Sequence, residues 1–136
     1  MKINMAQLER ELTAYFASVL GMTIDHSIFR GGIPDGVPEG VAVMISSEVV
    51  SKHIDFPTFR IQVAGKFYDR DNAFEIVAKL RESQPVNGHQ MDEYIIVSLV
   101  AEGDIVAPYQ AFDDGEEKHC VSFNAEVSIL TSSAGA

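Results

Sequence analysis

The side chains of this chain that could do chemistry are four histidines, one cysteine and twenty carboxylates. A zinc site needs three or four converging ligands, which are commonly paired at short spacing in the sequence. His26, His53 and His89 lie far apart and form no such pair with one another or with a carboxylate. His119 and Cys120 are adjacent, and neighbours on a strand point to opposite faces, so one metal ion does not easily bind both. We therefore expect neither a metal site nor a cofactor.

The other reactive motifs are incomplete. Residues 113–117 read Asp-Asp-Gly-Glu-Glu, which lacks the alternating acidic spacing and the closing Glu of an EF-hand, so a solvated acidic hairpin tip is expected. Gly31-Gly32 lacks the Lys-Ser/Thr pair of a phosphate-binding loop. Cys120 lies in an alternating strand pattern, which does not suit an exposed nucleophile. The sequence therefore predicts no catalytic residue and a protein that is not an enzyme.

Composition indicates a folded domain with an acidic surface. Of the 136 residues 46% are hydrophobic, and the formal charge is −10, with ten basic residues spread along the chain. Such a surface repels nucleic acid, so specific binding to DNA or RNA is not expected. A single cysteine excludes an intrachain disulfide and suits a reducing compartment. No apolar run reaches the ~20 residues needed to span a bilayer, and no signal peptide is visible, so we expect synthesis in the cytoplasm.

Two segments carry clear helical signals. Asn4 is a candidate N-cap for a helix over residues 5–20, and Gly21 is a natural helix stop. Further along, a strand over residues 59–63 alternates apolar and polar side chains and leads into a second helix capped by Asp69. This helix places its apolar side chains at helical spacing, at Ala73, Val77 and Leu80.

The remaining strands follow from shorter patterns. Residues 41–45 are a short apolar strand, expected to pair antiparallel with the strand before the second helix. Residues 94–101 are almost continuously apolar, which predicts a central strand covered on both faces. Residues 121–129 alternate and predict a strand with one buried face. Residues 22–40, 84–90 and 102–118 are expected to be loops, the last with an acidic hairpin tip.

These elements predict an α+β fold. We expect a mainly antiparallel four-strand sheet with two helices packed on one face, in the order helix-strand-strand-helix-strand-strand. Residues 1–130 should form a single domain and residues 131–136 a flexible C-terminal tail.

Four stretches, taken in order, carry a resemblance to a known family. They are the N-terminal helix through Leu20-Gly21, the Gly-Pro-Asp loop of residues 29–39 leading into residues 41–45, the strand–helix unit of residues 59–80, and the acidic turn of residues 113–116 followed by residues 122–125. Together they cover nearly the whole chain. In this order and spacing they resemble the tail-terminator or tail-completion proteins of long-tailed bacteriophages, a family that includes prophage proteins called minor capsid proteins.

The resemblance implies a non-enzymatic structural protein of the virion tail or neck. Six copies would form a ring that caps the tail tube, ends its polymerisation and presents a surface to the head. The implied partners are other copies of the chain, the tail-tube protein and the head-side connector protein, with no membrane. In such a channel the negative charge would keep the wall from binding DNA; ordinary solubility explains the charge equally well.

A ring joins one patch of each copy to a different patch of its neighbour. The two long loops are the segments that could supply such patches without disturbing the sheet. The candidate assembly residues are therefore Arg30, Ile33, Pro34, Asp35, Val37 and Glu39 in the first loop, and Asp113, Asp114, Glu116, Glu117 and Lys118 in the second.

Three other functions remain open at the level of sequence. A head-completion or neck protein would assemble as a ring at the same junction. A small α+β module binding a ligand or peptide would need a concave pocket between residues 22–40 and the sheet. A diverged enzyme would need carboxylates that converge in one cleft.

Overall fold

The computed structural model describes residues 3–50, 56–113 and 115–132. Within these residues lie two helices and one seven-stranded mixed sheet. The elements, in chain order, are α1 (Met5–Leu20), β1 (Ile28–Arg30), β2 (Gly40–Val49), β3 (Thr58–Phe67), α2 (Arg70–Glu82), β4 (Val86–Gln90), β5 (Tyr94–Ala101), β6 (Tyr109–Asp113) and β7 (Glu116–Thr131).

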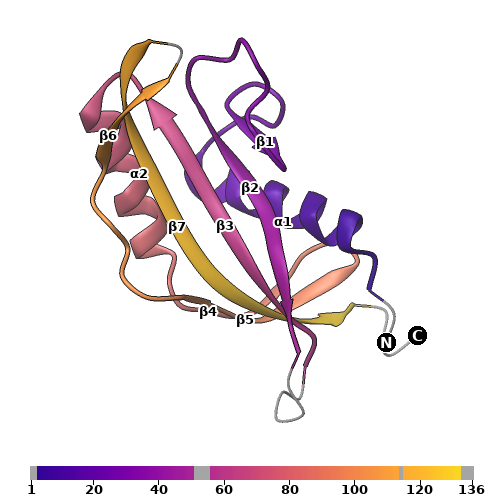
Figure 1. Cartoon of the computed structure of the whole chain (residues 1–136). Coiled ribbons are helices and arrows are strands. Elements are labelled where there is room, and N and C mark those ends of the chain that lie inside the picture. Colours follow the sequence, from indigo (N-terminus) through magenta and orange to yellow (C-terminus); the bar gives the residue numbers. More distant parts are fainter. Residues whose placement is uncertain (1–2, 51–55, 114, 133–136) are drawn as a thin grey trace.

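The sheet has the strand order β1-β2-β3-β7-β5-β4, and β6 pairs with the first residues of β7. β1 and β2 run parallel, and the other neighbours are antiparallel. Both helices lie behind the sheet in Figure 1, on the same face. The α+β class is as expected, but the prediction of a four-strand sheet is wrong. β1, β4 and β6 formed in segments predicted to be loops. β1 has only three residues, two of them adjacent and buried, and the described side chains of β4 and β6 are mostly exposed, so none of the three leaves an alternating pattern.

The two helices begin where their caps predict. Asn4 precedes α1, and its side chain accepts a hydrogen bond from the Gln7 N–H; Gly21 ends the helix in the left-handed conformation, at φ 66°. Asp69 caps α2 by accepting from the Asp71 N–H. Asp71 lies in the first turn of α2, where the helix dipole favours a negative charge. Both predicted helices are therefore confirmed.

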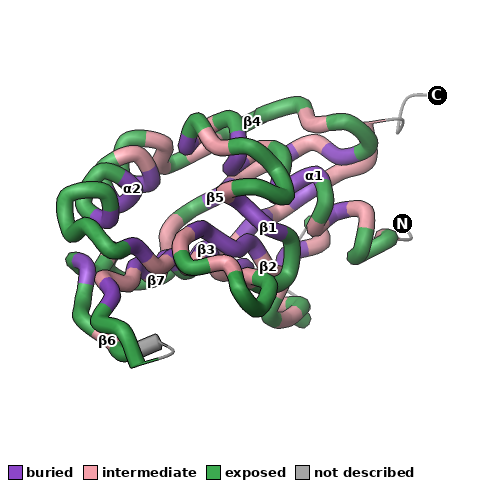
Figure 2. Tube along the Cα trace, turned by 90° about the horizontal axis from the view of Figure 1, so that it is seen from above, coloured by how far each residue is buried: buried purple, intermediate pink, exposed green. Residues whose placement is uncertain are grey.

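The core lies between the helices and one face of the sheet. On β3 and β7 every second residue is buried, and opposite pairs such as Val63 and Phe123 share this inner face. Phe16 of α1 packs edge to face against Phe123, with ring centroids 6.4 Å apart. Figure 2 shows these buried segments along the middle of the molecule. The alternation predicted for β3 and β7 is confirmed.

β5 differs from its prediction as a fully covered central strand. It lies between β7 and the edge strand β4. Tyr94, Ile96 and Leu99 are buried, whereas Val100 is 50% exposed. The helices cover only one face of the sheet, so the apolar side chains on the other face of β5 stay partly in contact with solvent.

The chain end predicted to be flexible begins as ordered structure. β7 runs to Thr131. Ser132 then donates from its N–H to the Glu93 carbonyl and from its hydroxyl to the Asp92 carbonyl, both at 2.8 Å. The remaining tail residues, 133–136, lie outside the described residues.

Two carboxylates of α1 tie this helix to distant parts of the sheet. Glu11 is 6% exposed. Its Oε1 accepts the backbone N–H groups of Asp92 and Glu93, in the turn between β4 and β5, and of Tyr94, the first residue of β5, at 3.0, 2.8 and 3.1 Å. Asp92 and Glu93 belong to no strand, so the carboxylate supplies the acceptor that their amides need.

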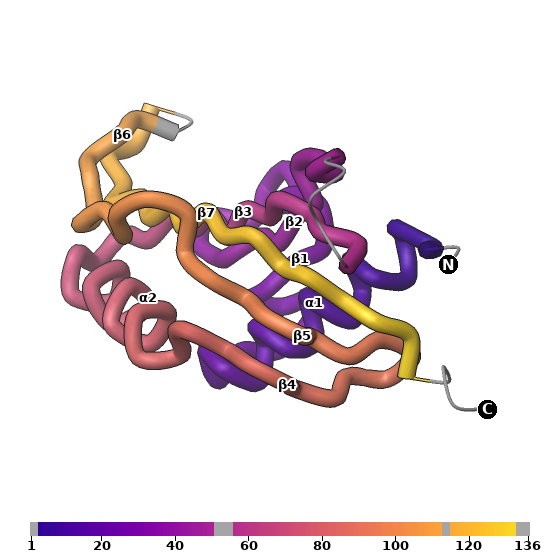
Figure 3. The backbone as a smooth tube through the Cα atoms, turned by 90° about the horizontal axis from the view of Figure 1, so that it is seen from below, coloured from indigo at the N-terminus to yellow at the C-terminus, as the bar shows by residue number. Residues whose placement is uncertain are grey.

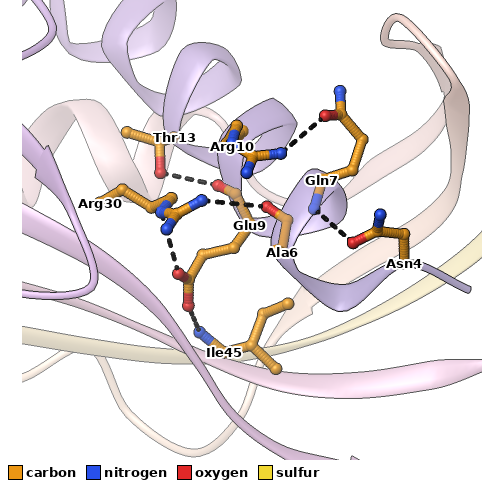
Figure 4. A network of polar contacts seen from close by, with 8 residues as sticks. All are labelled: Asn4, Ala6, Gln7, Glu9, Arg10, Thr13, Arg30 and Ile45. Atoms are coloured by element: carbon orange, nitrogen blue, oxygen red, sulfur yellow. Dashed lines mark hydrogen bonds and ion pairs between the residues drawn. The ribbon is translucent and has the colours of Figure 1, made fainter.

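Glu9 makes the matching contact at the other side of the sheet. Its Oε2 accepts the N–H of Ile45, at the point where the pairing of β2 with β3 shifts register. Its Oε1 lies 3.5 Å from the Arg30 Nε of β1. Figure 4 shows Glu9 between these two partners. α1 is thus fixed to β1 and β2 through one carboxylate and to the β4–β5 turn through another.

Glu11→Ala should lower the free energy of unfolding by about 2–3 kcal/mol, because three backbone amides lose a charged acceptor. Urea unfolding followed by circular dichroism measures the change. Glu82→Ala, at an exposed position of α2, is the matched control and should stay within about 0.5 kcal/mol of the unsubstituted chain. Equal stability of the two variants would contradict the role assigned to Glu11.

Candidate assembly surface

The structure brings the two predicted loops together through a residue that was not among the candidates. The backbone N–H of Tyr68 donates to Glu39 Oε1 of the first loop at 2.7 Å. The Tyr68 hydroxyl donates to Glu116 Oε2 of the β6–β7 hairpin, also at 2.7 Å. Tyr68 thus links the loop to the hairpin, and both lie at the same end of the molecule (Figure 1).

The other strand of the hairpin is held by α2. Arg70 Nη1 donates to the carbonyl of Pro108, immediately before β6, at 3.3 Å. The same guanidinium lies 4.9 Å from the ring centroid of Phe74. Pro108 is buried, so the base of the hairpin is packed against the body while β6 projects from it (Figure 3). Contacts at both strands give the hairpin a defined direction.

This projecting segment exposes large apolar side chains. We call residues 105–113 and 115–118 the arm. Phe112 is 81% exposed, Val106 55% and Tyr109 49%. Apolar side chains grouped on one projection are typical of an interaction site rather than of ordinary surface. These residues were not predicted from the sequence, although residues 105–112 contain no charged side chain in an otherwise acidic chain.

The predicted residues of the first loop divide into two groups. Pro34 and Asp35 are exposed, whereas Ile33, Val37 and Glu39 are half-buried. Arg30 lies on β1, and its guanidinium pairs with Glu9 of α1 and donates to the Ala6 carbonyl at 3.4 Å (Figure 4). Arg30 therefore belongs to the α1 attachment, apart from the surface shared by the loop and the arm.

The predicted residues of the arm also divide. Glu116 and Glu117 are exposed. Lys118 is only 2% exposed, and its ammonium lies 5.0 Å from the ring centroid of Tyr68, so it packs within the link. Asp113 ends β6, but its side chain, like the whole of Asp114, lies outside the described residues.

A cleft of about 450 Å³ opens between the first loop, the end of α1 and α2. This is the place where a ligand-binding module would need its pocket. Its charged groups are already paired within the protein. Lys79 donates to the Leu20 carbonyl at 3.2 Å and lies 3.3 Å from Glu75, and Glu39 accepts from Tyr68. The cleft therefore offers few free charges for orienting a ligand.

In the described part of the chain, no three His, Cys, Asp or Glu side chains come close enough together to hold a metal ion. No helix in the same residues is both long enough and apolar enough to cross a membrane.

Comparison with protein-family models finds no match, and comparison with curated protein sequences finds none. Among solved structures, the chain is similar to one in the virion of a native gene transfer agent (GTA) particle. The two superimpose with a TM-score of 0.44 at 13% sequence identity, over 90% of each chain. A likeness of this degree assigns neither a family nor a function.

The Tyr68 link makes a prediction about titration. The hydrogen bond to Glu116 raises the pKa of the Tyr68 phenol above its usual value, because the bond requires the protonated hydroxyl. Glu116→Ala should bring this pKa down towards its usual value. Titration followed by carbon NMR of ring-labelled tyrosine measures the shift. Glu117→Ala removes an exposed charge next to Glu116 and should leave the pKa unchanged; an equal shift in both variants would contradict the link.

Proposed function

We propose that this chain is a non-enzymatic structural protein of a phage-type virion. It forms a ring on the tail tube, ends tube polymerisation and helps to join the tail to the head. The observation that carries the proposal is the arm, which is anchored at both strands and exposes Phe112 to solvent. The sequence resemblance to tail-terminator proteins supplies the specific role.

The arm suits assembly because its shape does not depend on a partner. Arg70 holds its first strand and Tyr68 its second, so little conformational freedom remains to be lost on binding. A ring also requires that each copy contact its two neighbours through different surfaces. An arm that projects from one end of the molecule can provide one of these two surfaces.

The charge of the chain agrees with a position around DNA. A formal charge of −10 on a small protein disfavours binding of the phosphate backbone. A ring lined by such subunits would let DNA pass without holding it. The same charge also favours solubility, so it is consistent with the proposal but is not the evidence for it.

Deletion of the gene from its host, followed by electron microscopy of the induced particles, tests the role. A terminator predicts filled heads beside overlong, unjoined tails, because tube growth is no longer ended. Expression of the unsubstituted chain from a plasmid should restore tails of normal length. A Glu82→Ala chain, altered at an exposed position of α2, should restore them equally.

The other outcomes are equally specific. Tails of normal length that fail to join heads would replace the terminator role with that of a head-completion or neck protein. Normal particles would overturn a virion role. The cleft of about 450 Å³ beside the first loop would then become the place to search for a ligand or peptide.

A further inference from the structure

A second concave surface lies between α1 and the edge strand β4. It is a groove of about 510 Å³ whose apolar wall includes Tyr15 and Val19 of α1 and Met91 after β4. His89 of β4 closes one side, with its ring 5.0 Å from that of Tyr15. Glu11, which holds the β4–β5 turn, forms part of the groove. The groove therefore has a fixed wall on each side.

β4 leaves one of its backbone edges open. In the described structure it pairs with β5 alone, and most of its five residues are exposed. At the opposite side of the sheet, β1 is covered by its own turn: Ile28 donates to the Thr23 carbonyl and accepts from the Asp25 N–H. An open edge is a template for a further strand. Residues 83–91, around β4, contain no charged side chain.

The arm has the complementary properties. β6 also has five residues and pairs, among the described strands, with β7 alone. Its sequence up to Phe112 is uncharged, and Phe112 and Tyr109 project into solvent. The same chain thus carries an exposed, largely apolar strand and a largely apolar groove beside an open edge. Residues 105–112 of the arm and residues 83–91 around β4 contain no charged side chain, while Glu11 and Asp92 also line the groove.

We propose that the arm of one copy docks in the groove between α1 and β4 of a second copy. Two chains of charge −10 repel each other over most of their surface, and residues 105–112 of one copy and 83–91 of the other are runs without charge along which they can approach. Phe112 covers the apolar wall around Tyr15, and β6 lies along the open edge of β4. Addition of a strand to an exposed sheet edge is a common mode of protein recognition.

This contact joins two different surfaces, so each docked copy still offers a free groove or a free arm. Successive copies then form either a closed ring or an open chain, depending on the rotation between neighbours. The inference rests on the proposed function only in taking a second copy as the occupant. It names the surfaces that would join the subunits of the ring.

Site-directed cross-linking of the purified full chain tests the contact. In a Cys120→Ser background, one sample carries Phe112→Cys and another carries His89→Cys. Both positions are exposed, and circular dichroism checks that each variant is folded. A flexible bis-maleimide added to the mixture should give a covalent dimer that contains one copy of each variant. Ala78→Cys on the exposed side of α2 replaces His89→Cys in the control mixture and should give no such dimer.

Three results would overturn the proposal. They are a dimer formed by Phe112→Cys alone, equal yields with the Ala78→Cys control, and no dimer at any protein concentration. The first would show that arms contact arms.

A second measurement uses sedimentation velocity of chains that keep Cys120. Phe112→Asp should abolish self-association, and adding His89→Lys to the same chain should restore it by charge pairing; a double variant that stays monomeric would contradict docking beside β4.

These experiments use purified protein without any phage component. Cross-linking can therefore fail while the deletion phenotype still shows a terminator, and the proposed function would then stand with another subunit contact. Conversely, a specific cross-link would support the contact even if deletion of the gene left the particles normal, and normal particles would exclude the virion role.

Discussion

The position of α1 across the sheet depends on the carboxylate of Glu11. Much of the remaining structure relies on this contact. The Glu11 carboxylate accepts three backbone N–H groups at and beside the β4–β5 turn. Glu9, half a turn earlier in the helix, accepts the N–H of Ile45 at the point where the pairing of β2 with β3 shifts register. Strand pairing leaves such amides without partners, and buried amides need an acceptor. The two glutamates supply it, and Glu11 also forms part of the groove between α1 and β4.

The junction of β3 and α2 has a similar role for the arm. Three consecutive residues act on different parts of the molecule: Tyr68 binds the second strand of the arm, Asp69 caps α2, and Arg70 binds the residue before the first strand. A helix cap fixes the backbone of its neighbours, so the side chains on either side of Asp69 leave it in defined directions. The arm is therefore oriented by the same turn that begins α2.

The distribution of charge separates surfaces that can meet from surfaces that repel. With twenty acidic and ten basic residues, most approaches between two copies bring carboxylates together. Residues 83–91 and 105–112 are free of charge, and the structure places them at an open edge and on a projection. Charge thus selects among orientations, while apolar contact supplies the attraction.

The sequence alone determined those elements whose signals are local. α1, α2 and their caps, together with the alternation of β3 and β7, follow from side-chain spacing within one element. β1, β4 and β6 did not follow, because three residues of β1 are too few to show a period and the described side chains of β4 and β6 are mostly exposed. The acidic tip was predicted, but the burial of Lys118 and the exposure of Phe112 depend on how the hairpin leaves the sheet. Only the tertiary structure decided the roles of Glu11 and Tyr68, since their partners lie 81–83 and 29 or 48 residues away in the chain. Folding brings those partners together, and no local sequence pattern indicates which distant residues will meet.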